Sequence, residues 1–260
     1  MMNKYAKLML LSLTILTLGA CSSHKKTEDS GETSKELSTK VSESSNESQI
    51  SSNSTDKSGE NEEEEIAHSG QVKTIDKGVS YNGSYYSIKG KYDEIVIVNK
   101  HYPLSPNYNP GEDATAKSEL LKLIAAMRDQ GYAISDQYSG FRSYETQVGL
   151  YQSYVNQDGQ AAADRYSARP GYSEHQSGLA FDLIDSSGNL VQEAGASQWL
   201  LDNAHKYGFV VRYPVGKESS TGYMPESWHL RYVGKEAKEI AESGLSLEEY
   251  YGFTGGNYVD

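Results

Sequence analysis

The sequence predicts an α+β fold in which a small antiparallel sheet is flanked by helices. Strand-like and helix-like runs occur in segregated groups, and the chain has no internal repeat. The roughly 190 residues that follow position 70 are ample for one domain with its own hydrophobic core. We therefore treat residues 71–260 as a single domain.

The first part of this domain is predicted to form strands. The run Tyr81-Asn82-Gly83-Ser84 is typical of a tight hairpin turn, because Asn-Gly accepts the positive φ that such turns require. Residues 94–98 predict a short apolar strand. Residues 107–113 are rich in Pro, Gly and Asn and predict a loop.

Three helices are predicted from apolar residues at helical spacing: over residues 115–130, after Ser143, and over about 197–207. Gly131 and Gly208 suit the ends of the first and third helices, and Ser143 is placed to cap the second. The residues expected to face inward are Leu120, Leu121, Ile124 and Met127, then Tyr144, Val148, Tyr151 and Val155, then Leu200, Ala204 and Tyr207.

The remaining strands are predicted over residues 133–138, 179–184, 209–213 and 228–233. Because side chains alternate along a strand, we expect His229 and Arg231 on one face of the last strand. Trp228, Leu230 and Tyr232 should lie on its other face. The chain from Gly234 onwards is predicted to be helical and polar.

Residues 1–21 resemble a bacterial lipoprotein signal. Lys4 and Lys7 precede an apolar run over residues 8–18, and small residues lead directly to Cys21. The run is too short for a comfortable membrane-spanning helix, which needs about 20 residues. We expect Cys21 to carry a lipid that anchors the mature protein at the outer face of a membrane, in a Gram-positive cell wall space. The alternative is an ordinary secretory signal with an incidental cysteine.

Residues 22–70 are rich in Ser, Glu, Lys and Asn and predict a disordered tether, because they offer almost no apolar surface to bury. The whole chain carries a net charge of -12, and part of this negative charge falls on the domain itself. An acidic domain argues against nucleic-acid binding, which needs a basic surface. Cys21 is the single cysteine, so no internal disulfide is expected.

His175, Asp182, Glu226 and His229 are candidates for a catalytic zinc site. Such a site takes three protein ligands and leaves one position for water, and imidazole and carboxylate groups suit the ion. Of the six histidines only His175 and His229 lie within motifs. Asp185 competes with Asp182 as a ligand, but its position before Ser-Ser-Gly is typical of a turn.

Three motifs in fixed order carry a resemblance to a known family. Residues 139–143, 168–182 and 226–229 resemble the VanY-type D-alanyl-D-alanine carboxypeptidases, over roughly residues 93–245. Within that family they look most like the LdcB-type L,D-carboxypeptidases. The resemblance implies the fold of the hedgehog and D-Ala-D-Ala peptidase group. It also implies a zinc metallocarboxypeptidase that acts on peptidoglycan stem peptides.

The resemblance further implies a role for each motif residue. One zinc ion per chain is expected on His175, Asp182 and His229. Glu226 is expected as general base, and Arg142 as the group that stabilises the oxyanion. The substrate contacts are expected to be Ser173, Gln147 and Trp228.

The resemblance favours removal of the C-terminal D-Ala from a stem tetrapeptide, which is L,D-carboxypeptidase activity. Two alternatives stay open from the sequence. One is D,D-carboxypeptidase activity on the pentapeptide, which the motifs do not distinguish. The other is a catalytically silent lipoprotein that binds peptidoglycan. The presence of both Glu226 and Arg142 argues against the silent protein, which could lose either residue freely.

Overall fold

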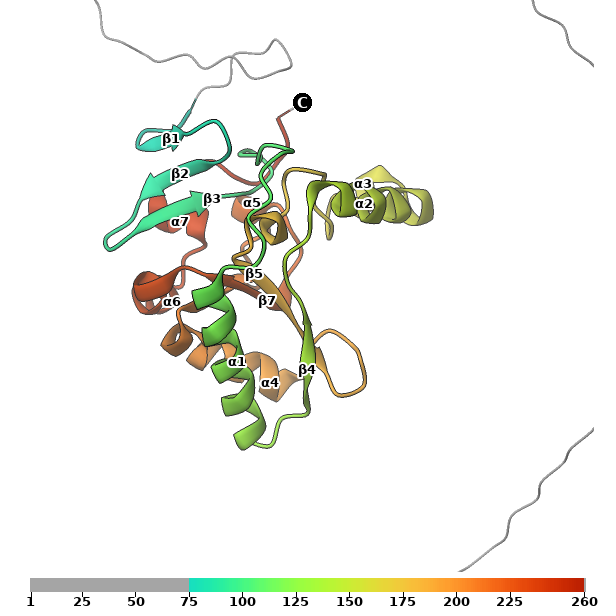
Figure 1. Ribbon diagram of the computed structural model, residues 1–260, viewed down its shortest axis with the longest axis vertical. Helices are drawn as coiled ribbons and strands as arrows, with labels where there is room; N and C mark the ends of the chain where they lie inside the picture. The colour runs from blue at the N-terminus through green and yellow to red at the C-terminus, as the bar shows by residue number, and fades with distance from the viewer. Residues whose placement is uncertain (1–74, 260) are drawn as a thin grey trace, which may run out of the picture. The chain divides into compact units, whose positions relative to one another are not determined.

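A computed structural model describes residues 75–259 of the chain and contains two antiparallel sheets (Figure 1). The four-stranded sheet has the order β4-β5-β7-β6, formed by β4 (Ile134–Ser139), β5 (Ala180–Asp185), β7 (Glu226–Tyr232) and β6 (Phe209–Tyr213). The three-stranded sheet contains β1 (Val79–Tyr81), β2 (Tyr86–Lys89) and β3 (Glu94–Ile97). The predicted α+β class with antiparallel pairing is confirmed.

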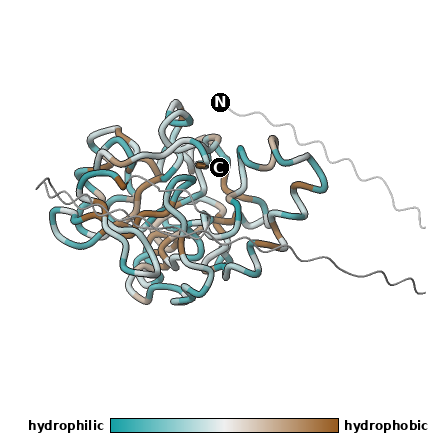
Figure 2. Tube along the Cα trace, turned by 90° about the horizontal axis from the view of Figure 1, so that it is seen from above, coloured by the Kyte–Doolittle hydropathy of each residue, from teal (hydrophilic) through white to brown (hydrophobic). Residues whose placement is uncertain are grey.

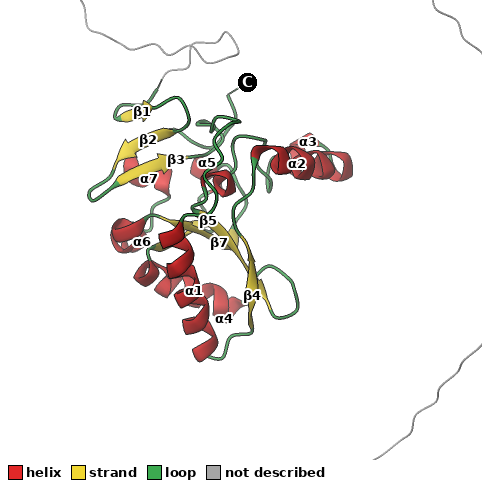
Figure 3. Ribbon diagram, in the orientation of Figure 1, coloured by secondary structure: helices red, strands yellow, loops and turns green. Residues whose placement is uncertain are grey.

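Helices follow β3 and every strand of the four-stranded sheet (Figure 3). The α-helices are α1 (Ala114–Asp129), α2 (Tyr144–Asp158), α3 (Gln160–Ala163), α4 (Ala194–Asn203), α5 (Glu218–Thr221), α6 (Ala237–Ser243) and α7 (Leu247–Tyr251). Short 3-10 helices are η1 (Glu174–Ser177), η2 (Ala204–Tyr207) and η3 (Gly234–Glu236). The three predicted helices correspond to α1, α2 and the joined α4 and η2.

The main core lies between the four-stranded sheet and helices α1 and α4. Phe181 and Leu183 of β5 and Leu230 of β7 are fully buried there, packed with residues of both helices. Because strand side chains alternate, Asp182 and His229 are directed to the opposite face of the sheet. The predicted alternation of β7 is therefore confirmed, and it determines where polar groups can gather.

The predicted cap of α2 is confirmed, whereas some residues predicted to face inward on the helices are exposed. Ser143 caps α2 as predicted, since its hydroxyl accepts a hydrogen bond from the Thr146 amide at 3.2 Å. Leu121, predicted to face inward, is 48% exposed, and Leu123 is buried instead. Val148, also predicted inward, is 43% exposed. Helix α2 lies away from α1 and α4 (Figure 1), so its apolar residues do not reach the main core.

A second core joins the three-stranded sheet to the end of the chain. Its buried members are Tyr86, Ile97, Tyr102, Val210, Val233, Ala237, Ile240, Leu247 and Phe253. The chain beyond Gly234 is helical as predicted, but the expectation that it is polar is wrong, because α6 and α7 bury apolar side chains here. In Figure 2 the hydrophobic stretches of the trace lie mostly within the fold.

The predicted hairpin at residues 81–84 is confirmed. Asn82 Oδ1 accepts hydrogen bonds from the amides of Ser84 at 2.9 Å and Tyr85 at 3.0 Å, and Gly83 has a φ of 92°. The predicted signal, the tether and Cys21 lie outside the described residues. Within residues 75–259 no helix has the length and apolar character needed to cross a membrane.

Candidate active site

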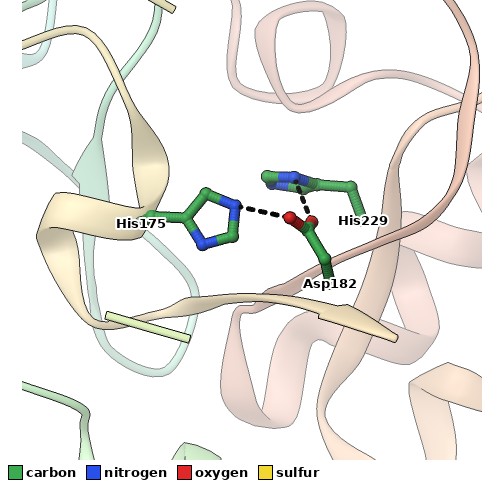
Figure 4. A group of neighbouring side chains, drawn as sticks. All are labelled: His175, Asp182 and His229. Carbon is green, nitrogen blue, oxygen red and sulfur yellow. Dashed lines mark ion pairs between the residues drawn. The ribbon is translucent and has the colours of Figure 1, made fainter. Parts of the chain in front are cut away.

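Three elements bring the predicted metal ligands together (Figure 4). His175 lies on η1, and Asp182 and His229 are register partners on the paired strands β5 and β7. His175 Nε2 lies 3.1 Å from Asp182 Oδ2, and His229 Nδ1 lies 3.0 Å from Asp182 Oδ1. One ligand atom from each residue falls within 4.8 Å of the other two, which is close enough for a single ion.

Each imidazole is oriented by a hydrogen bond on its other nitrogen. His175 Nδ1 lies 2.8 Å from the carbonyl oxygen of Gly140, and a carbonyl can only accept, so Nδ1 carries the proton. His229 Nε2 lies 3.2 Å from Glu174 Oε2 in the same way. The nitrogens turned toward Asp182 are therefore the ones available to a metal.

The donor set fits a zinc ion. Asp182 Oδ1 is buried and has no hydrogen-bond partner, although His229 Nδ1 lies 3.0 Å away, because that contact lacks hydrogen-bond geometry. If Nδ1 of His229 and Oδ1 of Asp182 both present lone pairs, the two atoms repel one another at this distance unless a positive charge lies between them. Burial lowers the pKa of His229, but the nearby carboxylates of Asp182 and Glu174 outweigh this and raise it to about 10. The cluster thus favours a cation, and imidazole and carboxylate ligands suit zinc.

Glu226 lies beside the three ligands without belonging to them. It begins β7 and pairs with Tyr213 of β6, and its Oε2 lies 3.6 Å from His229 Nδ1. Burial, with smaller contributions from the Asp182 and Glu174 charges, raises the pKa of Glu226 to about 7, although His229 and Arg142 oppose the shift. A carboxylate in this position can exchange a proton with water near neutral pH.

Arg142 is held in place by hydrogen bonds at its guanidinium group. Its Nη1 donates to Gln147 Oε1 at 2.9 Å and its Nη2 donates to Ser139 Oγ at 3.1 Å. The side-chain nitrogen Nε2 of Gln147 donates in turn to the Ala168 carbonyl at 2.6 Å. Gln147 is 1% exposed and has both amide groups engaged, so in this structure it supports Arg142, and its direct contact with substrate stays a prediction.

A cavity of about 200 Å³ opens onto this cluster. Ser173 and Trp228, both predicted to contact substrate, line it together with Arg142, Glu226 and the three candidate ligands. Sequence reasoning missed Leu150 and Tyr154 of α2, and Tyr213 of β6, which also line the cavity. The sequence predicted that Val155 faces inward, whereas its neighbour Tyr154 lines the cavity. The face of α2 that meets the site therefore lies one position earlier in the sequence than predicted.

Asp185, the competing ligand, is a turn residue as expected. Its Oδ1 accepts hydrogen bonds from the amides of Ser187 at 2.8 Å and Asn189 at 3.0 Å. Sequence reasoning also missed Glu174, which is buried behind His229. The signal that could have found it is its position directly before a predicted ligand.

Comparisons with known proteins agree with this geometry. The VanY family, described as D-alanyl-D-alanine carboxypeptidase, matches residues 111–235. The solved LdcB LD-carboxypeptidase is 71% identical, with a TM-score of 0.69 and coverage of 71% of this chain and 98% of that one. The L,D-carboxypeptidase DacB of Streptococcus pneumoniae is 74% identical, with a TM-score of 0.69 and coverage of 70% and 98%.

A more distant solved relative carries metal. It is the vancomycin resistance D,D-pentapeptidase VanY of a VanB-type cassette, solved in complex with Zn(II). It is 35% identical to this chain, with a TM-score of 0.53 and coverage of 59% of this chain and 96% of that one. Given the family match and the extent of these likenesses, the chain is a carboxypeptidase that belongs to the VanY family.

Proposed function

We propose that this protein is a zinc-dependent L,D-carboxypeptidase that removes the C-terminal D-Ala from a peptidoglycan stem tetrapeptide, by cutting between L-Lys and D-Ala. The observation that carries the proposal is the meeting of a three-ligand cluster, a buried carboxylate and an anchored arginine on one cavity. The LdcB and DacB L,D-carboxypeptidases, at 71% and 74% identity, support the tetrapeptide over the pentapeptide.

The chemistry is hydrolysis of an amide bond. A zinc ion held by His175, Asp182 and His229 supplies the Lewis acidity that makes water a nucleophile near neutral pH. Glu226 takes a proton from the attacking water and passes it to the nitrogen of D-Ala as the C–N bond breaks. The products are free D-Ala and a tripeptide with a new terminal carboxylate.

Arg142 stabilises the negative charge that develops on the scissile carbonyl oxygen. Its guanidinium lines the cavity, and the bonds to Gln147 and Ser139 hold it in advance of the reaction. A preorganised charge of this kind needs no reorganisation when the transition state forms. Ser173 and Trp228, at the cavity wall, position the peptide.

Residues 1–21 support a proposal for where the protein acts. We infer from residues 1–21 that Cys21 carries a lipid anchor, so that the domain acts on peptidoglycan outside the membrane of a Gram-positive cell. Membrane fractionation of cells that express Cys21→Ser tests this. Retention of the variant in the membrane at the level of the unmodified protein would contradict the anchor.

Substrate choice is tested with defined peptides. Purified zinc-loaded protein is incubated with a tetrapeptide ending L-Lys-D-Ala and a pentapeptide ending D-Ala-D-Ala, and the products are read by mass. We expect one D-Ala to leave the tetrapeptide faster, and amidation of its C-terminus to abolish cleavage. Rapid shortening of the pentapeptide alone would indicate a D,D-carboxypeptidase. Cleavage of neither peptide would indicate a silent peptidoglycan-binding protein.

A further inference from the structure

Glu174 lies at the centre of a buried charged cluster behind the candidate metal site. It is 2% exposed, and its Oε1 accepts hydrogen bonds from Arg212 Nε at 2.8 Å and Arg231 Nη1 at 2.7 Å. Its Oε2 faces His229 Nε2 at 3.2 Å. One carboxylate oxygen is thus occupied by two arginines, and the other is left for the imidazole.

Both arginines are anchored on their far sides. Arg212 binds Glu248 of α7 through two hydrogen bonds, from Nη1 to Oε2 at 2.8 Å and from Nη2 to Oε1 at 2.5 Å. Asn99 Nδ2 donates to the same carboxylate at 3.1 Å. Arg231 Nη2 donates to the Val96 carbonyl at 2.6 Å. The guanidinium groups therefore cannot turn away from Glu174 without breaking buried bonds elsewhere.

The charges in this cluster balance. Two arginines face two carboxylates, Glu174 and Glu248, and all four side chains are buried. Oε1 of Glu174 accepts hydrogen bonds from two guanidinium groups, which can only donate, and Oε2 faces the imidazole of His229. The geometry therefore makes Glu174 an acceptor with a fixed orientation.

We propose that Glu174 is a positioning residue for the metal site: anchored by Arg212 and Arg231, its carboxylate holds the proton of His229 on Nε2 and keeps Nδ1 free to bind zinc. The inference rests on the proposed zinc site. His175 obtains the same orientation from the Gly140 carbonyl, whereas His229 obtains it from a carboxylate. A carboxylate partner also makes the imidazole a stronger ligand.

Glu174→Gln is the informative variant because glutamine keeps the size of the side chain but is not symmetric. If its oxygen faces the arginines, its NH₂ group faces Nε2 of His229 and displaces the proton toward Nδ1, the ligand atom. If its oxygen faces His229, its NH₂ group faces two guanidinium donors. Either orientation conflicts with a neighbour, and we expect zinc affinity to fall by about 10- to 100-fold.

The matched control is Glu248→Gln, which changes the same cluster without touching His229. Zinc affinity of each variant is measured by competition with a chelator, and thermal stability is measured alongside. We expect Glu248→Gln to lower stability and to reduce zinc affinity much less than Glu174→Gln does, because Arg231 still holds Glu174 beside His229. Unchanged affinity in Glu174→Gln, or an equal loss in both variants, would overturn the inference.

A measurement on the unmodified zinc-loaded protein covers the case in which Glu174→Gln does not fold. The ring nitrogen resonances of His229 should show the metal on Nδ1 and a proton on Nε2 that is protected from exchange. Metal on Nε2 would overturn the inference. Unmodified protein that binds no zinc would overturn the proposed function and this inference together. Unmodified protein that binds zinc and releases D-Ala, beside an unaffected Glu174→Gln variant, would overturn only the inference.

Discussion

At the scale of single residues, the site depends on which atoms each side chain presents. Asp182 and His229 face one another across β5 and β7, and His229 offers Nδ1 because Nε2 is engaged by Glu174. Glu226 precedes His229 by three residues and lies 3.6 Å from it at the closest approach. That separation allows Glu226 to act on water beside the ligands without being one of the three that converge.

Replacement of Glu226 by Gln tests this division of roles. The change removes the base and leaves the three ligands, so we expect zinc content equal to that of the unmodified protein. Release of D-Ala should fall by about 10²- to 10⁴-fold, the usual contribution of general base catalysis. Metal analysis and a D-Ala release assay measure the two effects. His229→Ala is the control that should lose both, and loss of zinc from Glu226→Gln would mean that Glu226 is a ligand.

At the scale of elements, Gly178 joins the helical turn η1, which carries His175, to strand β5, which carries Asp182. It has a φ of 75°, and its backbone bonds to His175 and Asp113 at 3.2 and 3.0 Å. A Cβ added at this position would lie 2.0 Å from the carbonyl oxygen of Gly111. The turn that sets the ligand spacing therefore requires glycine for two reasons, its positive φ and the close approach of another backbone segment.

Gly178→Ala and Gly188→Ala form a matched pair that separates these two reasons. Gly188 also has a positive φ, 86°, but a Cβ there would meet nothing within 4 Å. We expect Gly188→Ala to lower the free energy of unfolding by about 1 to 2 kcal/mol, the cost of the left-handed conformation. Gly178→Ala should lose at least a further 1 to 3 kcal/mol through overpacking. Urea unfolding measures both, and equal losses would show that the contact with Gly111 can relax.

At the scale of the molecule, two hydrophobic cores contain residues of the strands that carry the site or pair with them. The main core lies under β5 and β7, and the second core ties α6 and α7 to the three-stranded sheet. Glu248 lies on α7, a helix that packs into the second core, and its carboxylate accepts a hydrogen bond from Arg212 of β6. The end of the chain is thus linked to His229 through a continuous set of buried ion pairs.

Removal of the metal should lower the stability of the whole protein. A ligand that binds only the folded chain stabilises it by about 4 kcal/mol when its concentration is about a thousand times its dissociation constant. We therefore expect a chelator to lower the Tm of zinc-loaded protein, and added zinc to restore it. His229→Ala should show no response to the chelator. A Tm that is the same with and without chelator in the unmodified protein would contradict a zinc site built into the fold.

The sequence by itself determined the positions of the strands and of the three longest helices, and it singled out the candidate ligands and the candidate base. These features depend on local information: the periodicity of apolar residues, an Asn-Gly turn, a capping serine, and short motifs that can be recognised along the chain. The alternation of β7 was predictable for the same reason, because side chains on a strand must point to opposite faces.

Only the tertiary structure decided what each side chain meets. Helix α2 has apolar residues at helical spacing, yet Val148 faces solvent because no core element packs against that face. Gln147 accepts a hydrogen bond from Arg142 and donates one to the carbonyl of Ala168. The second bond joins segments that are separate in the chain. Glu174 meets Arg212 and, through it, Glu248, whose position 74 residues later no local pattern encodes. Such contacts arise when strands and helices pack, and packing depends on the whole fold.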